Sequence, residues 1–471
     1  MTKSISGKNV ARNTLISVGA QAVSLLTSLI LNLIIPKYIS EVQYAHWQTY
    51  LLYVSYVGLL HFGLLDGIVL KYSQYDYEEL DKRTMKDYFF LLLCQLICFS
   101  ISLLLVNTFF FSGTSKQIFY FIVISLITKN LLTFVSYLFQ ITNRIYRYAY
   151  LIIVQKIFFL GSSILLLLIG NKSFYLFCII DIFTDVVGIT YGIINNIEIF
   201  KTARNKHLIL KDELYDTYIS GIPLLISNFT SNLILGSSKI IVKLYWPILI
   251  FGKISFGFSL ANLFLTFVMS ISVVLFPSLK RMKDKHLVNV YFYIRYALVA
   301  CLLIAMSLYF PAAFILGKWV PNYSESIKYA GILLPIIIYS TKESLLNNNY
   351  LKMFRKERIM LKLNVVSIIL ELTLILLSLI LIKNIYVVLL ITVTIICFKS
   401  IIGEAIVSNI LGLNFYIENV LEILLSVIFI FCSLFSSHFK GFVIFTFFMI
   451  IYFVALRDKF IKVFSYKKEL N

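Results

Sequence analysis

About fourteen long apolar runs follow one another along this chain, and they limit its fold more than any other feature. Each run is long enough to cross about 30 Å of hydrocarbon as an α-helix that rises 1.5 Å per residue. The chain is 60% hydrophobic and only 14% charged, which is too apolar for a soluble domain of 471 residues. We therefore predict an all-α membrane protein. Its expected spans are residues 13–35, 45–69, 88–111, 118–140, 148–169, 174–198, 219–241, 250–276, 293–316, 327–348, 361–382, 385–409, 418–436 and 441–457.

The loops between these runs alternate in charge. Loops on one side hold roughly three times as many Lys and Arg as loops on the other, as expected for cytoplasmic loops. The link at residues 410–417 has no basic residue and is placed inside by parity alone. The sequence thus predicts a multi-pass protein with both termini in the cytoplasm.

Several function classes are disfavoured by what the sequence lacks. The net charge of +19 is explained by the inside loops, so we expect no nucleic-acid partner. The six cysteines lie in apolar runs and form no metal-ligand pattern, so we expect no metal site. The sequence has no phosphate-binding glycine loop and no hydrolase motif, and its loops are too short for a soluble active site. We expect a protein that is not an enzyme.

The two halves of the chain resemble each other. The first span leads into Pro36-Lys37-Tyr38 and an aromatic-rich second span, and the seventh leads into Lys243-Leu-Tyr-Trp246 and a similar eighth. Six spans separate these copies, and an even number gives repeats of the same orientation. We predict two pseudo-symmetric six-helix lobes, residues 1–210 and 211–412, followed by two further helices and a cytoplasmic tail in residues 413–471.

On these residues the chain resembles polysaccharide-type flippases, the Wzx-like exporters of lipid-linked oligosaccharide in the multidrug/oligosaccharidyl-lipid/polysaccharide (MOP) superfamily. The similar stretches are residues 13–38 and 58–72, Gly221-Ile222-Pro223, residues 317–326 and residues 349–358. Many relatives carry an Asp near the end of the seventh span, where this chain has Ser238-Lys239.

The resemblance implies an alternating-access transporter of the bacterial cytoplasmic (inner) membrane. Its cargo would be an undecaprenyl-diphosphate-linked oligosaccharide repeat unit, exported for surface polysaccharide such as O-antigen or capsule. The expected partners are this polyprenyl-diphosphate-linked oligosaccharide, membrane lipid and a polysaccharide polymerase. We expect no cofactor, with H⁺ or Na⁺ coupling left open.

Charged side chains within the spans are the candidate site, because each costs several kcal/mol, about 2.5–3.5 at mid-bilayer for Lys. A diphosphate headgroup needs cations, and lysine binds phosphate as a mobile point charge. We predict that Lys129, Lys156, Lys239 and Lys399 line a cationic cavity and that Arg12 lies at its cytoplasmic mouth. The alternatives are structural ion pairs for the lysines and a positive-inside anchor for Arg12.

The other polar residues inside the spans have two interpretations each. The acids Asp181, Asp185, Glu371 and Glu404 could carry a coupling ion or pair with the lysines. A polar cavity wall is predicted at Asn228, Asn232 and Asn262, which could instead join helices by hydrogen bonds.

Two rival functions stay open. A multidrug/cation antiporter of the same superfamily would use Asp181 and Asp185, although five intramembrane lysines disfavour a cationic cargo. A membrane-embedded polyprenyl-linked glycan polymerase or transferase would need a large outside loop, and the outside links here are short.

Overall fold

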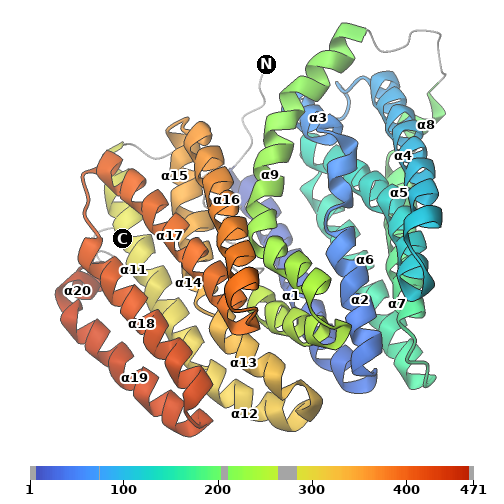
Figure 1. Cartoon of the computed structure of the whole chain (residues 1–471). Helices are drawn as coiled ribbons and strands as arrows, with labels where there is room; N and C mark the ends of the chain where they lie inside the picture. The colour runs from blue at the N-terminus through green and yellow to red at the C-terminus, as the bar shows by residue number, and fades with distance from the viewer. Residues whose placement is uncertain (1–6, 74, 203–210, 264–283, 466–471) are drawn as a thin grey trace. The chain divides into compact units, whose positions relative to one another are not determined.

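The computed structural model describes residues 7–73, 75–202, 211–263 and 284–465, and these are helical with no strand among them (Figure 1). By contacts between Cα atoms the chain divides into two compact units, residues 1–232 and 233–471. The first half of α9 packs with the first unit, whereas we predicted a lobe boundary at residues 210 and 211. The predicted lobes and their central cavity stay predictions.

The first unit holds ten helical segments within the described residues. They are α1 (Gly7–Tyr38), α2 (Glu41–Val54), η1 (Val57–His61), α3 (Leu64–Tyr72), α4 (Lys82–Phe110), α5 (Gly113–Ile141), α6 (Ile145–Leu168), α7 (Phe174–Asn195), α8 (Ile197–Lys201) and the first part of α9 (Lys211–Tyr245).

The second unit continues α9 and adds a short apolar helix, Ile248–Leu263. Its labelled elements are α11 (Asp284–Ser307), α12 (Tyr309–Trp319), η2 (Pro321–Tyr323), α13 (Ser324–Leu333), α14 (Ile336–Thr341), η3 (Lys342–Asn347), α15 (Asn348–Met353), α16 (Glu357–Leu381), α17 (Ile385–Leu411), α18 (Tyr416–Phe435), α19 (His438–Ala455) and α20 (Arg457–Ser465).

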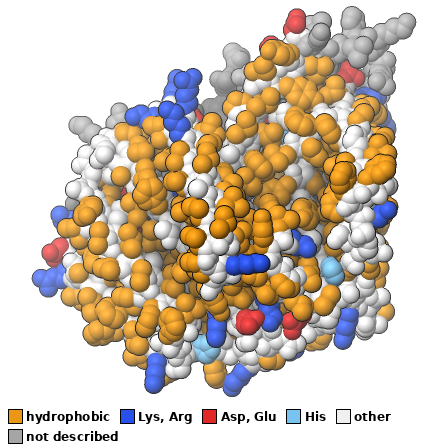
Figure 2. Space-filling model, viewed as in Figure 1, with side chains coloured by type: hydrophobic (Ala, Val, Ile, Leu, Met, Phe, Trp, Pro, Cys, Tyr) orange, Lys and Arg blue, Asp and Glu red, His pale blue; other side chains and the backbone are white. Residues whose placement is uncertain are grey.

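The predicted multi-helix membrane fold is confirmed. Ten described helices are long and apolar enough to span a membrane, or up to twelve if each of two bent pairs is counted as one span. One pair is α2 with η1 followed by α3, and the other is the two parts of α9. The predicted eighth span lies partly outside the described residues. The predicted tenth span coincides with the broken series α13, α14, η3 and α15, which is not among the helices counted as long and apolar enough to span. Hydrophobic side chains cover most of the face shown in Figure 2.

The broken tenth span has a local cause. Pro335 stands between α13 and α14 and has no N–H to donate to the preceding turn. From Lys342 to Asn347 the helix widens into a π-helix, η3. Such widened turns are frequent at functional sites. Here the turn carries Lys342 and Glu343, whose charges are both paired within the second unit.

Candidate functional site

In the first unit, an ionic cluster joins the middles of α5 and α7. Lys129 Nζ on α5 lies 3.0 Å from a carboxylate oxygen of Asp181 and 3.0 Å from one of Asp185, both on α7. Tyr50 Oη on α2 donates to Asp181 at 2.8 Å, and Thr128 Oγ1 donates to Asp185 at 3.1 Å. The two aspartates are one helical turn apart, so both reach the same ammonium group.

Lys156 on α6 lies near this cluster but makes no ion pair with any described residue. It is exposed to the charges of Lys129, Asp181 and Asp185 at longer range. Both aspartates are in direct contact with Lys129, and no described carboxylate neutralises Lys156 by direct contact.

Lys239, in the second half of α9, contacts an aromatic ring. Its Nζ lies 4.8 Å from the centre of the Phe258 ring, a cation–π contact with the short helix Ile248–Leu263. No carboxylate forms an ion pair with it among the residues that the structure describes. Its neighbour Ser238 is buried, and its hydroxyl donates a hydrogen bond to the Leu235 carbonyl within the same helix.

The remaining predicted lysine, Lys399, is paired. Its Nζ lies 2.6 Å from Glu343 Oε1, and both side chains are mostly buried between α17 and η3. Glu371 on α16 is fully buried and accepts a hydrogen bond from Thr392 Oγ1 at 2.9 Å. These contacts fit the structural alternative for Lys399, an ion pair within the second unit.

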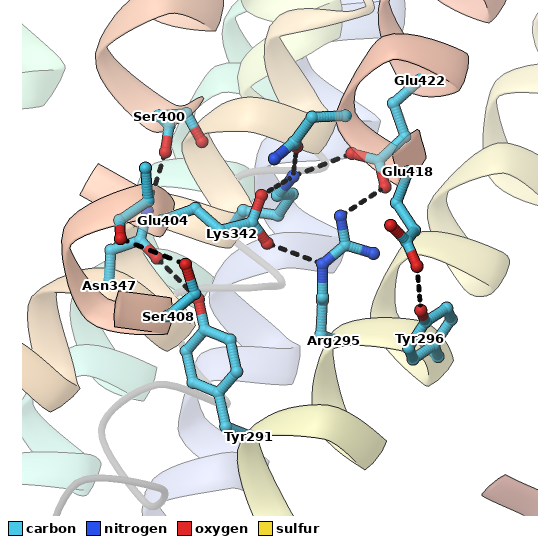
Figure 3. Close-up of polar contacts among 12 residues, drawn as sticks. Tyr291, Arg295, Tyr296, Lys342, Asn347, Ser400, Glu404, Ser408, Glu418 and Glu422 are labelled. Carbon is cyan, nitrogen blue, oxygen red and sulfur yellow. Dashed lines mark hydrogen bonds and ion pairs between the residues drawn. The ribbon is translucent and has the colours of Figure 1, made fainter. Parts of the chain in front are cut away.

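The second unit also encloses a buried ionic network that involves the predicted residue Glu404 (Figure 3). Arg295 on α11 lies 2.6 Å from Glu404 on α17 and 2.9 Å from Glu422 on α18. Lys342 on η3 lies 2.6 Å from Glu404, 2.8 Å from Glu422 and 2.7 Å from Asn419 Oδ1. All four charged side chains are 0–1% exposed, and two cations balance two anions.

Next to this network, Glu418 extends the pairing to the end of the chain. It accepts from Tyr296 Oη at 2.5 Å and forms an ion pair with Lys459 on α20. The two helices after the predicted repeat, α18 and α19, are therefore part of the packed second unit. Tyr452 on α19 also donates to Glu422 at 3.3 Å.

Sequence reasoning missed Arg295, Glu418 and Glu422. We counted Arg295 among the basic loop residues, although it lies two positions inside the predicted span 293–316. Glu418 and Glu422 stand one turn apart at the start of span 418–436, and that spacing could have marked them. Lys342, the fifth lysine within the predicted spans, is fully buried and paired within this network.

The three asparagines predicted to line a polar cavity are exposed or half-buried in the structure. Asn228 and Asn232 are exposed along α9, and Asn262 is half-buried in the short helix with an interaction of its own. Arg12 belongs to α1, but its side chain lies outside those that the structure describes. The predicted asparagine and arginine roles therefore stay predictions.

A polar cavity of about 450 Å³ lies among the basic-side loops of the first unit. The guanidinium of Arg144 lies 3.7 Å from the centre of the Tyr77 ring and donates to Thr142 Oγ1 at 2.9 Å. Burial lowers the pKa of Arg144 to about 10. Acidic residues (Asp76, Glu78, Glu198) and arginines (Arg144, Arg147) both line this cavity, so it does not favour a cargo of either charge. Within the described residues, no group of three His, Cys, Asp or Glu is arranged to hold a metal ion.

Comparison with solved structures finds the same fold in several membrane transporters. A lipid II flippase, MurJ, in an inward closed conformation, has a TM-score of 0.66 at 13% identity and covers 95% of this chain and 99% of its own. A multidrug resistance MATE transporter of the MOP superfamily is similar in both inward- and outward-facing conformations. The TM-scores are 0.60 and 0.54, each at 9% identity over 85% of this chain and 98% and 96% of the MATE chains.

No protein-family model and no curated protein matches the sequence. The chain has the fold of MOP-superfamily transporters, and these neighbours are transporters and flippases rather than enzymes. The fold is the one expected from the resemblance stated above, and the likeness to polysaccharide flippases stays a proposal.

Proposed function

We propose that this protein is a flippase that moves an undecaprenyl-diphosphate-linked oligosaccharide across the bacterial inner membrane by alternating access. The single observation that carries the proposal is Lys239, a lysine inside a membrane helix with no acidic partner among the described residues. A cation in that position is costly, and an anionic cargo would offset the cost each time it binds. Lys156, which forms no ion pair with a described residue, would add a second cation.

The similarity to MurJ supports a lipid-linked cargo, because that protein is a lipid II flippase with the same fold along 95% of this chain. A carrier must also release its cargo. Lysine suits that task, since it binds phosphate as a point charge and lacks the bidentate geometry of arginine. In this proposal a polymerase partner and membrane lipid receive the flipped oligosaccharide and its tail.

The proposal is tested by binding. Undecaprenyl diphosphate should raise the thermal unfolding midpoint of the purified protein, because a ligand of the native state stabilises it by mass action. Undecaprenol, which lacks the phosphates, should raise it less. Lys239→Gln should remove most of the difference between the two lipids. The matched control is Lys253→Gln, since Lys253, in the same short helix as Phe258, already pairs with the half-exposed Glu325. An equal diphosphate effect in Lys239→Gln and the native protein would contradict the proposal.

A second candidate, a MATE-like cation antiporter, is favoured by one observation, the adjacent carboxylates Asp181 and Asp185. In the structure the Lys129 ammonium occupies the position between them that a coupling cation would take. An antiporter would therefore need Lys129 to leave. Efflux of a cationic dye from a drug-sensitive strain, abolished by Asp185→Asn, would favour this candidate over the flippase.

A further inference from the structure

Two glycine-containing motifs of the sequence meet in the first unit. α3 begins after Gly63, which has a φ of +86°, and continues through Gly67, while Gly221 lies in the first half of α9. A Cβ added to Gly221 would lie 1.9 Å from Gly63 O and 2.5 Å from Gly67 N. A Cβ on Gly67 would lie 1.9 Å from the Thr217 carbonyl oxygen. The two backbones are thus in direct contact, and no larger residue fits at the crossing.

Polar contacts surround this crossing on its basic side. Glu213 on α9 pairs with Lys71 at 2.8 Å and accepts from Tyr72 Oη at 2.9 Å. One turn further along α9, Thr217 Oγ1 lies 2.9 Å from Tyr88 Oη of α4.

Tyr218 follows Thr217 directly in α9, and its Oη donates a hydrogen bond to Gln95 Oε1 of α4 at 2.5 Å. The residues from Glu213 to Gly221 therefore hold α3 and α4 against the start of α9. We call this set of contacts the α3–α9 clasp.

The outer contact of the clasp, the ion pair between Lys71 and Glu213, can separate at low cost, whereas the Thr217–Tyr88 hydrogen bond is buried. Lys71 and Glu213 are 37% and 30% exposed, so water can replace their ion pair, and partly exposed pairs contribute little to stability. Glycines facing a backbone bury almost no side-chain area. By contrast, the network of Arg295 and Lys342 is fully buried and would expose unpaired charges if it opened.

The helix that carries one half of the clasp also has a place to bend. Pro223 lies two residues after Gly221 and removes one backbone hydrogen bond from α9. Flexing at Pro223 would allow the part of α9 that precedes it to move away from α3.

We propose that the α3–α9 clasp is a gate on the basic, cytoplasmic side, which holds that side closed and separates when the cargo enters. The proposal deepens the flippase function and rests on it. Similar structures described as inward-facing and outward-facing occur for a MATE transporter of this fold. A chain of this fold that alternates between such states needs a contact on the cytoplasmic side that forms in one state only.

The first test locks the clasp. In a background without the six cysteines, Lys71→Cys and Glu213→Cys are joined by a bifunctional methanethiosulfonate reagent, which a reductant cleaves. In proteoliposomes that contain a fluorescent undecaprenyl-diphosphate disaccharide, the cross-link should reduce flipping at least tenfold, and the reductant should restore it. The two single-cysteine proteins treated with the same reagent are the controls. Flipping at the uncross-linked rate in the cross-linked protein would overturn the proposal.

The second test does not depend on any cargo. Thr217 is fully buried at the crossing, so Thr217→Cys in native membranes should react slowly with a membrane-impermeant maleimide added to inside-out vesicles. Gly221→Ala, which places a methyl group 1.9 Å from Gly63 O, should accelerate labelling severalfold by preventing closure. Gly58→Ala is the matched control, because nothing lies within 4 Å of its added Cβ.

The two tests separate the gate from the flippase. Unchanged Thr217→Cys labelling in folded Gly221→Ala protein would show a permanent packing contact and overturn the gate, whatever the cargo. Accelerated labelling without any flipping of the lipid would support the gate and contradict the proposed function. The melting temperature and the amount of protein in the membrane establish that each variant is folded.

Discussion

At the scale of single residues, intramembrane charges in this protein fall into two kinds. Arg295, Lys342, Glu404 and Glu422 are buried and mutually balanced, so their roles are explained by packing. Replacing a whole buried network by apolar residues is often neutral, but removing one member leaves an uncompensated charge. Lys239 is of the other kind, because no described acid accounts for it.

We predict that Arg295→Met destabilises the second unit by about 3–5 kcal/mol, the usual cost of breaking one partner out of a buried ion pair. Thermal unfolding in detergent, or the amount of folded protein in the membrane, measures this loss. Glu325→Gln removes one charge from the exposed pair with Lys253 and should cost no more than about 1 kcal/mol. Equal effects of the two substitutions would contradict the structural role of the network.

The sequence allowed us to name intramembrane charges but not to pair them. Lys129 with Asp181 and Asp185 was one of the alternatives we considered, because the two aspartates share a helix face. The pairing of Lys399 with Glu343 was not predictable, since it depends on how α17 lies beside η3. Helix periodicity gives the direction of a side chain within its own helix, whereas partners depend on the packing of other helices.

At the scale of elements, small residues determine how closely helices approach. A Cβ added to Gly192 of α7 would lie 1.7 Å from Val135 Cγ1 of α5, so this glycine sets the separation of the helices that carry the Lys129 cluster. Close approach through small residues is a common way to associate helices in lipid, where no hydrophobic force acts between them.

We predict that Gly192→Ala lowers stability by about 1–3 kcal/mol through overpacking against Val135. The second change Val135→Ala should recover most of that loss, because it removes the Cγ1 atom in the way. Gly161→Ala on α6 has nothing within 4 Å of its added Cβ and should be neutral or slightly stabilising. Failure of Val135→Ala to rescue Gly192→Ala would show that the close approach at Gly192 is not the cause.

The elements themselves were largely predictable from apolar length alone. Most expected spans correspond to single described helices, because a bilayer requires each crossing segment to satisfy its own backbone hydrogen bonds. The bends within helices were harder to predict from the sequence. The break at η1 involves Phe62 and Gly63 in left-handed conformations, and only the glycine marks it in the sequence.

At the scale of the whole molecule, orientation in the membrane follows from the charge of the loops. We predict that green fluorescent protein fused after Ser465 is fluorescent, because the charge of the loops predicts a cytoplasmic C-terminus. Alkaline phosphatase fused after Asn171 or after Pro247 should be active, since those loops are on the less basic side. An inactive phosphatase at Asn171 with an active one after Lys201 would invert the topology and the side of the proposed gate.

The central claim is that a cation without an acidic partner in a MOP-type fold serves a lipid-linked diphosphate cargo. The most direct measurement is flipping of a fluorescent undecaprenyl-diphosphate disaccharide in proteoliposomes, followed by chemical quenching of the label in the outer leaflet. The native protein and Lys253→Gln should move the lipid at similar rates, and the double variant Lys156→Gln/Lys239→Gln at least tenfold more slowly with its melting temperature unchanged. Equal rates for the folded double variant and the native protein would contradict the account.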